Sequence, residues 1–255
     1  MKKNKNEKAE IVYNQIANKY KQSKLLPFRI YVEKYTFFQL LGELKNKSVL
    51  DLACGEGIYT REIKKKGATI VYGVDISPKM IELAETEEKK NPLDIKYKVA
   101  DVAEMKKIEE FDIVCATYLL NYANTKDKLR AFAKAIYSNL KSGGKFVCIN
   151  DNINQHPDFY SLSRKYGFIK SASSVDQKEG DEITYTFLDE NGNQDFSFNN
   201  YYLHSATYET IFKEIGFASF KWIMPQLSLE IDEKDKSFWN DFLQHPPIIG
   251  IEACK

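Results

Sequence analysis

The stretch that decides the fold of this chain is VLDLACGEGIYT, which runs from Val49 to Thr60. It begins with an apolar run that predicts a buried strand, and the turn Gly55-Glu56-Gly57 follows before a predicted helix. Glycine permits a tight turn and lets a ligand approach the backbone, because no side chain stands in the way. The segment therefore predicts a ligand site at the end of a strand.

A carboxylate further along the chain supports this interpretation. Asp75 lies at the end of the next apolar run, TIVYGVDIS. An acidic residue about 20 positions past a glycine turn suits the hydroxyls of a ribose. We therefore expect the ligand to contain a nucleoside.

Apolar runs and amphipathic segments alternate along most of the chain. The expected strands are 47–52, 69–75, 94–99, 111–118, 145–150, 217–225 and 248–253. The expected helices are 28–44, 59–66, one that starts at Ser77 and Pro78, 127–140, 206–215 and 234–244. Strands this apolar, alternating with helices, indicate a parallel sheet that is covered on both faces.

The alternation is interrupted between 151 and 204. Residues 158–167 look helical, and two strands flank a hairpin turn at Asn191-Gly192. We therefore predict one doubly wound α/β domain with an inserted cap. Its expected parts are an N-terminal helical lid (1–46), a cofactor-binding part (47–150), the substrate cap (151–204) and the completion of the domain (205–255).

The composition limits the class of protein. Hydrophobic residues make up 43% of the chain, enough for a sizeable core, and a formal net charge of +1 leaves no basic footprint for nucleic acid. No uninterrupted apolar run of about 18 residues and no signal peptide is visible. We expect a cytoplasmic monomer or homodimer that acts on a small molecule and has neither a nucleic-acid nor a membrane partner.

Cysteines and histidines give no metal-site spacing. The 4 cysteines are far apart, with no CxxC pair, and the 3 histidines are scattered. Cys115 and Cys148 lie inside apolar runs, so we expect buried free thiols in a reducing compartment. No metal is expected at the site.

The form of the glycine turn narrows the choice of ligand. Thr60 stands where a dinucleotide fingerprint has its third glycine, and Glu56 would place a negative charge beside a pyrophosphate. The chain has no GxxxxGK[ST] string, which excludes a P-loop. A cofactor without phosphates fits better, and a nicotinamide-dependent oxidoreductase on the same kind of sheet is the alternative.

Four segments in order resemble the motif set of class I S-adenosylmethionine-dependent methyltransferases. They are VLDLACGEGIYT, GVDIS with Met80 shortly after, VADVAEM and FDIVCATYLLNY. The resemblance covers roughly 49–150. It implies a seven-stranded sheet whose last strand, 248–253, is antiparallel. It also implies S-adenosylmethionine as cofactor and S-adenosylhomocysteine as product.

The two ends of the chain suggest a narrower relationship. YNQIANKY, SKLLPFRIYVEKYTFFQLLGEL and the terminal PPIIGIEACK are similar to small-molecule methyltransferases of the toxoflavin (azapteridine) N-methyltransferase type.

The resemblance to the class I enzymes implies a role for each matched position. Gly55 and Gly57 would wrap the methionyl part of the cofactor, and Ala53 and Asp51 would hold its amino group. Asp75 would bind the ribose hydroxyls, Ile76 and Met80 would edge the adenine, and Asp101 and Val102 would bind its polar atoms. Ala116, Thr117 and Tyr118 would lie near the sulfonium. The alternatives are a simple turn for the glycines, a helix-capping carboxylate for Asp75, core packing for Ile76 and Met80, and plain loop structure for Asp101 and Val102.

Further cofactor contacts are expected from the N-terminal part. Arg29 is the candidate partner of the methionyl carboxylate, because a guanidinium suits a carboxylate, and a salt bridge to Glu33 is its alternative. Tyr13 and Tyr20 share one face of a predicted helix. They either close over the cofactor as a lid or form a packed aromatic stripe.

Aromatic residues of the cap indicate a flat, heteroaromatic acceptor, with N-methylation favoured over O-methylation. The expected substrate contacts are Tyr118, Tyr185, Phe187, Tyr201 and Tyr202, with Phe196 and Phe198 in the same run. His204 is the candidate general base, and an ordinary histidine at a helix start is the alternative. A non-catalytic protein that binds the cofactor is the second functional reading.

Overall fold

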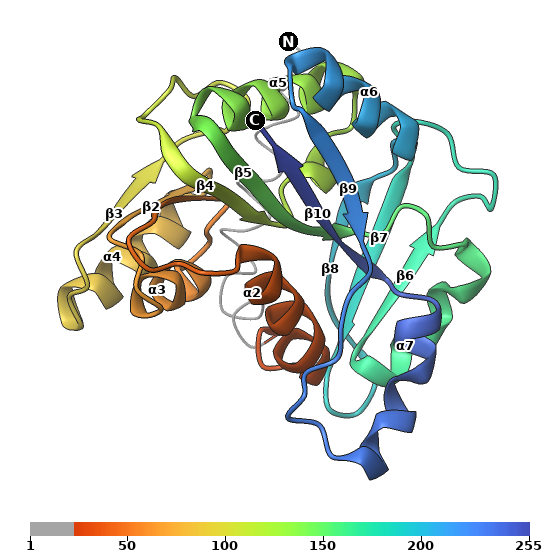
Figure 1. The fold of residues 1–255 in the computed structure, drawn as a ribbon. Helices are drawn as coiled ribbons and strands as arrows, with labels where there is room; N and C mark the ends of the chain where they lie inside the picture. Colours follow the sequence, from red (N-terminus) through yellow and green to blue (C-terminus); the bar gives the residue numbers. More distant parts are fainter. Residues whose placement is uncertain (1–22) are drawn as a thin grey trace.

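The computed structural model describes residues 23–255, so the predicted first helix with Tyr13 and Tyr20 lies outside the described residues. The main sheet has seven strands in the order β3-β2-β1-β4-β5-β10-β9 (Figure 1). The strands are β1 (Ser48–Leu52), β2 (Ile70–Asp75), β3 (Ile95–Val99), β4 (Phe111–Thr117), β5 (Leu140–Asp151), β9 (Ser219–Ile223) and β10 (Ile248–Cys254).

Strand direction confirms the predicted fold class. Strands β1 to β5 pair in parallel, and β10 is antiparallel to both of its neighbours, β5 and β9. Strand β1 lies between β2 and β4, and all of its residues are buried, as expected for a central strand covered on both faces. Cys115 and Cys148 are buried free thiols, as predicted.

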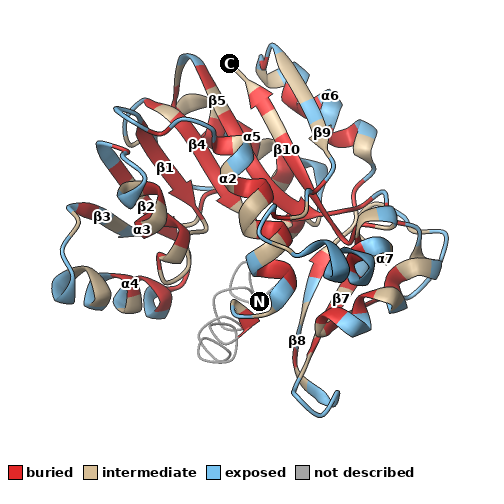
Figure 2. Ribbon diagram, turned by 60° about the horizontal axis from the view of Figure 1, so that its bottom comes forward, coloured by how far each residue is buried: buried red, intermediate tan, exposed pale blue. Residues whose placement is uncertain are grey.

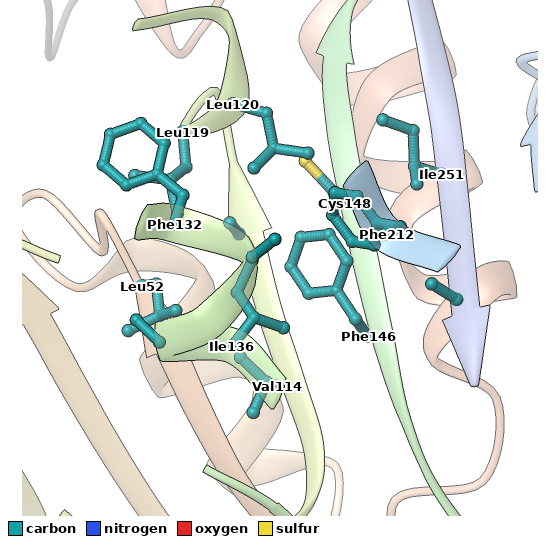
Figure 3. Packing of buried hydrophobic residues seen from close by; sticks show 14 of the residues in the cluster. Leu52, Val114, Leu119, Leu120, Phe132, Ile136, Phe146, Cys148, Phe212 and Ile251 are labelled. Carbon is teal, nitrogen blue, oxygen red and sulfur yellow. The ribbon is translucent and has the colours of Figure 1, made fainter. Parts of the chain in front are cut away.

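Helices cover the two faces of this sheet. One face packs against α5 (Lys126–Ser138) and α6 (Ser205–Ile215), where Val114 and Phe146 of the strands meet Ile136 and Phe212 of the helices (Figure 3). The other face packs against η1 (Arg29–Lys34), α2 (Tyr35–Leu41) and α3 (Ile58–Lys65). Apolar strand faces are thereby buried on both sides, while the outward surfaces of the helices are exposed (Figure 2).

Helix α4 (Pro78–Lys90) begins as the sequence predicts. The Ser77 hydroxyl accepts a hydrogen bond from the Met80 N–H at 3.2 Å, and Pro78 occupies the first turn. Both residues favour a helix start. The Ser77 side chain accepts from a backbone N–H that would otherwise have no partner in the helix, and proline has no backbone N–H that needs one. Within the described residues no helix is long and apolar enough to cross a membrane.

A second, three-stranded antiparallel sheet lies between β5 and α6 in the chain. It has the order β6-β7-β8 and is preceded by the 3-10 helix η3 (Pro157–Tyr166). The predicted hairpin is confirmed as β7 (Glu182–Leu188) and β8 (Gln194–Tyr201), but β6 (Phe168–Ala172) was missed. Lys170 is buried in the middle of β6, so this strand lacks an apolar pattern.

The last predicted helix, 234–244, is present in two parts. A 3-10 segment, η4 (Glu233–Trp239), leads into the short helix α7 (Asn240–Gln244). Both pack near the second sheet through Trp239 and Phe242, which belong to the same cluster of buried residues as Phe168.

Candidate active site

Gly55 and Gly57, which follow β1, are required to be glycine for different structural reasons. Both have positive φ, +57° at Gly55 and +80° at Gly57. A Cβ atom at Gly55 would meet nothing within 4 Å, whereas one at Gly57 would overlap the Tyr97 hydroxyl. Gly55 therefore leaves open space beside the backbone, while Gly57 makes room for Tyr97 of β3. Ala53 also has a positive φ, +57°, a strained conformation typical of functional sites.

Asp75 ties the glycine turn to the start of α4. Its two carboxylate oxygens accept hydrogen bonds from the N–H groups of Gly55 and Ser77, both at 2.8 Å. Burial raises the pKa of Asp75, and these N–H donors oppose that shift. Each carboxylate oxygen has a second lone pair, so Asp75 can still accept a hydrogen bond from a ligand.

A cleft opens at the carboxyl ends of β1, β2 and β4. It encloses about 670 Å³ of space, part of it open to solvent. Nine residues predicted from the sequence line this cleft: Ala53, Gly55, Asp75, Ile76, Met80, Asp101, Val102, Thr117 and Tyr118. Apolar walls, a carboxylate at the edge and open space beside Gly55 fit a nucleoside with a flat base.

Four other residues of the cleft escaped the sequence analysis: Leu119, Tyr122, Lys128 and Phe132. Leu119 precedes the short 3-10 helix η2 (Leu120–Tyr122) after β4, Tyr122 is its last residue, and the other two come from α5. Lys128 and Phe132 are four residues apart and so share a helix face. Such spacing is typical of ordinary core packing and carried no signal for a ligand.

A smaller pocket continues the cleft along the glycine turn. It shares Ala53, Gly55, Met80 and Thr117 with the cleft, and its further lining residues are Lys24, Cys54, Glu56, Ile58 and Tyr59. Lys24 is the cation among its described lining residues.

Four of the predicted cofactor residues within the described part of the chain do not line the cleft: Gly57, Ala116, Asp51 and Arg29. Gly57 packs against Tyr97, and Ala116 is buried in the core because side chains alternate along β4. Asp51 is buried and accepts a hydrogen bond from the Thr60 hydroxyl at 2.6 Å. Burial raises the pKa of Asp51 to about 7, although the Thr60 hydrogen bond opposes the shift.

Arg29 makes the salt bridge that the sequence left as its alternative. Its guanidinium lies 2.8 Å from the Glu33 carboxylate, and both side chains are buried. The hydroxyls of Tyr59, at 2.7 Å, and of Tyr118 also donate to Glu33. Burial alone would raise the pKa of Glu33, but Arg29, Lys24 and the two hydroxyls hold it below its usual value. This carboxylate joins η1, α3 and the end of β4.

A separate pocket lies between the end of β4 and the three-stranded sheet. It encloses about 270 Å³, part of it open to solvent. Its lining residues are Phe28, Arg29, Tyr118, Tyr185, Phe187, Phe198, Asn200 and Ile248. We call it the aromatic pocket. Tyr118 lines both this pocket and the cleft, and its φ of +65° is strained.

Three of the predicted substrate residues, Tyr118, Tyr185 and Phe187, line the aromatic pocket. Tyr201 and Tyr202 do not, and Tyr201 has the opposite side-chain direction from Asn200 because strand residues alternate. His204 precedes α6, where its Nδ1 lies 3.0 Å from the Tyr202 hydroxyl, and it lines neither cavity. Among residues 23–255 no group of three potential metal ligands is present.

Comparison with known proteins finds matches to the central part of the chain. Residues 49–144 match the family described as "Methyltransferase domain". The ubiquinone biosynthesis O-methyltransferase of Pelagibacter ubique is 38% identical over 84 residues, 33% of this chain and 35% of that protein. The ribosomal protein L11 methyltransferase of Paraburkholderia phytofirmans is 38% identical over 101 residues, 40% of this chain and 31% of that protein. The chain thus spans about a third of the length of these two relatives.

Solved structures match nearly the whole chain. An S-adenosylmethionine-dependent methyltransferase from Clostridium acetobutylicum has a TM-score of 0.63 at 22% identity, covering 95% of this chain and 98% of that one. A putative S-adenosylmethionine-dependent methyltransferase from Listeria monocytogenes has a TM-score of 0.59 at 22% identity, covering 88% and 96%. Residues 49–144 are therefore similar to a methyltransferase domain, and the chain has the Rossmann-like fold that is found in S-adenosylmethionine-dependent methyltransferases.

Proposed function

We propose that this protein transfers the methyl group of S-adenosylmethionine to a small, flat, heteroaromatic acceptor. The observation that carries the proposal is the shared wall of the two cavities. Tyr118 lines both the cleft that fits a nucleoside and the aromatic pocket, so ligands in the two cavities would both contact this residue. Methyl transfer requires this kind of positioning, because the donor and acceptor must approach in line.

The bound cofactor supplies an activated methyl group on a sulfonium, and the chain supplies binding and orientation. Asp75 holds the ribose, the apolar walls around Ile76 and Met80 hold the base, and Gly55 leaves room for the methionyl part. Arg29 is committed to Glu33, so Lys24 takes over the pairing with the methionyl carboxylate that the sequence assigned to Arg29. Asp51 and Gly57 do not contact the cofactor in this proposal and instead stabilise the conformation of the glycine turn.

The lining of the aromatic pocket favours nitrogen over oxygen as the methyl acceptor. Among its described lining residues there is no carboxylate and no histidine, so no ordinary general base faces the pocket. A neutral ring nitrogen attacks with its lone pair and needs no base, whereas a hydroxyl must lose a proton. The toxoflavin-type similarity of the chain ends points the same way.

Calorimetry with S-adenosylhomocysteine tests the cofactor part of this proposal. Wild-type protein should bind it, and Asp75→Ala should weaken binding about 10- to 100-fold, the effect of losing hydrogen bonds to a charged group. Glu82→Ala, an exposed change on α4, the helix that follows Asp75, is the matched control and should bind normally. Unchanged affinity in Asp75→Ala would refute the proposed ribose contact.

Turnover separates an enzyme from a protein that only binds the cofactor. Methyl-labelled S-adenosylmethionine is incubated with a panel of heteroaromatic compounds, and the products are analysed by mass spectrometry and NMR. We expect label on a ring nitrogen of at least one compound. Cofactor binding without transfer to any of them would favour the non-catalytic alternative.

A further inference from the structure

Three buried asparagines meet where the three-stranded sheet contacts the main sheet. Asn121 and Asn150 have no exposed surface, and Asn200 is 1% exposed. The Asn121 amide nitrogen donates to the Asn200 amide oxygen at 2.8 Å. The Asn121 backbone N–H donates to the Asn150 amide oxygen at 3.0 Å. Most buried amides are hydrogen-bonded, but the Asn121 amide oxygen has no hydrogen-bond partner among residues 23–255.

The hydrogen bond between the side chains of Asn121 and Asn200 connects the walls of the two cavities. Asn121 belongs to η2, between Leu119 and Tyr122, which both line the cofactor cleft. Asn200 lies on β8 and lines the aromatic pocket. The orientation of the Asn200 amide is therefore set from the wall of the cofactor cleft.

The hydrogen bond also determines what Asn200 offers to the pocket. Its amide oxygen is engaged by Asn121, and no group in residues 23–255 accepts a hydrogen bond from its amide nitrogen. The group that it presents is thus an N–H donor. Of the other polar side chains of the pocket, Tyr185 donates from its hydroxyl to Asp151 at 2.6 Å, Tyr118 donates to Glu33, and Arg29 is paired with Glu33 through Nη1.

We propose that Asn200 selects the acceptor by donating a hydrogen bond to it, and that Asn121 is the positioning residue that fixes this polarity. The acceptor class is a flat, neutral aromatic ring system that carries a hydrogen-bond acceptor, a ring nitrogen or a carbonyl oxygen, at its edge. Net charge is disfavoured because the one charged side chain of the pocket, Arg29, is already balanced by Glu33. This inference rests on the proposed function and specifies its substrate.

The test uses the full chain saturated with S-adenosylhomocysteine and three bicyclic probes of similar size. Quinoline has a hydrogen-bond acceptor, indole has a donor, and naphthalene has neither. Affinities are measured by ligand-observed NMR titration at neutral pH. Wild-type protein should prefer quinoline to the other two by about tenfold, the contribution of one good hydrogen bond.

Variants at the two asparagines distinguish recognition from simple packing. Asn200→Leu should abolish the preference, and Asn200→Asp should reverse it toward indole, because a carboxylate accepts. Asn121→Asp cannot donate to Asn200, so the Asn200 amide should turn and present its oxygen, again favouring indole. A merely structural role for Asn121 predicts weaker binding of all three probes without reversal.

The matched control is Asn199→Leu. Asn199 is the neighbour of Asn200 on β8, but its exposed side chain bonds to Thr184 and Glu182, and its loss should leave the preference unchanged. Equal binding of the three probes to the wild-type complex would overturn the inference while leaving cofactor binding intact. Failure of S-adenosylhomocysteine to bind would instead overturn the proposed function itself.

Discussion

At the scale of single residues, Gly55 and Gly57 separate ligand binding from folding within one turn. Gly55→Ala adds a Cβ atom in open space at positive φ, so we expect about 1–2 kcal/mol less stability and a loss of S-adenosylhomocysteine affinity above about tenfold. Gly57→Ala also overlaps Tyr97 and should lower the free energy of unfolding further, by about 3 kcal/mol or more. Urea unfolding and calorimetry measure the two effects.

Gly143→Ala is the control for both changes. Gly143 has a φ of +74°, and a Cβ there would meet nothing within 4 Å, but it lies in β5 and lines neither cavity. The Gly143→Ala variant should therefore lose only the free energy of unfolding that a positive φ costs a residue with a side chain. If Gly57→Ala proves no less stable than Gly143→Ala, the close approach of Tyr97 is not what requires glycine.

Asp51 predicts a pH dependence of stability. Burial raises its pKa to about 7, above the ordinary 3.8, so the folded state binds the proton more tightly than the unfolded state does. The resulting stabilisation is fully present below about pH 4 and is lost as the pH rises through 7. A shift of about three units corresponds to about 4 kcal/mol.

Asp51→Asn removes this titration while keeping the shape and the hydrogen bond from Thr60. Its stability relative to wild type should therefore increase between pH 5 and pH 8, as measured by urea unfolding at each pH. A difference that stays constant over this range would show that Asp51 is ionised in the folded protein throughout.

At the scale of elements, a buried ion pair anchors the three-stranded sheet to the main one. Lys170 of β6 lies 2.6 Å from Asp151 at the end of β5, and neither side chain is exposed. The Lys170 ammonium also bonds to Gln155 at 3.0 Å, and the Tyr185 hydroxyl of β7 bonds to the same Asp151 oxygen. Two strands of the second sheet, β6 and β7, are thus held by polar contacts to Asp151 and to Gln155.

Removing one partner of this pair should be worse than removing both charges. Lys170→Met leaves the Asp151 carboxylate buried without its cation, and we expect a loss of about 3–5 kcal/mol in the free energy of unfolding. The double variant Lys170→Met with Asp151→Asn should recover most of that loss. A double variant as unstable as the single one would mean that the contacts of Lys170, and not the charge balance, stabilise the sheet.

Elements were predictable where their hydrophobic pattern was strong. The parallel strands, the Ser77 cap and the hairpin at Asn191-Gly192 are all visible in the sequence, because each depends on near neighbours. Strand β6 was not, because its central Lys170 is buried through contacts with Asp151 and Gln155, 19 and 15 residues earlier. Local patterns cannot show a polar residue that is neutralised from a distant part of the chain.

At the scale of the whole molecule, the two tyrosines of the predicted lid, Tyr13 and Tyr20, lie outside the described residues. If Tyr13 and Tyr20 close over the cofactor, replacing both by Ala should weaken S-adenosylhomocysteine binding by about tenfold or more, because each ring buries apolar area only in the complex. The melting temperature without ligand should change little. A packed aromatic stripe predicts the reverse, a lower melting temperature and normal affinity, and Asn14→Ala is the control.

The sequence alone determined the sheet, the glycine turn and the carboxylate after β2, because these depend on short-range patterns of apolar residues, glycine and charge. Eight of the expected cofactor residues, from Ala53 to Thr117, accordingly line the cleft together with Tyr118. Only the tertiary structure decided that Arg29 is neutralised by Glu33, that Gly57 serves Tyr97, and that Asn121 orients Asn200. Each of these contacts depends on packing in three dimensions, which decides whether a polar side chain faces a ligand or another part of the protein.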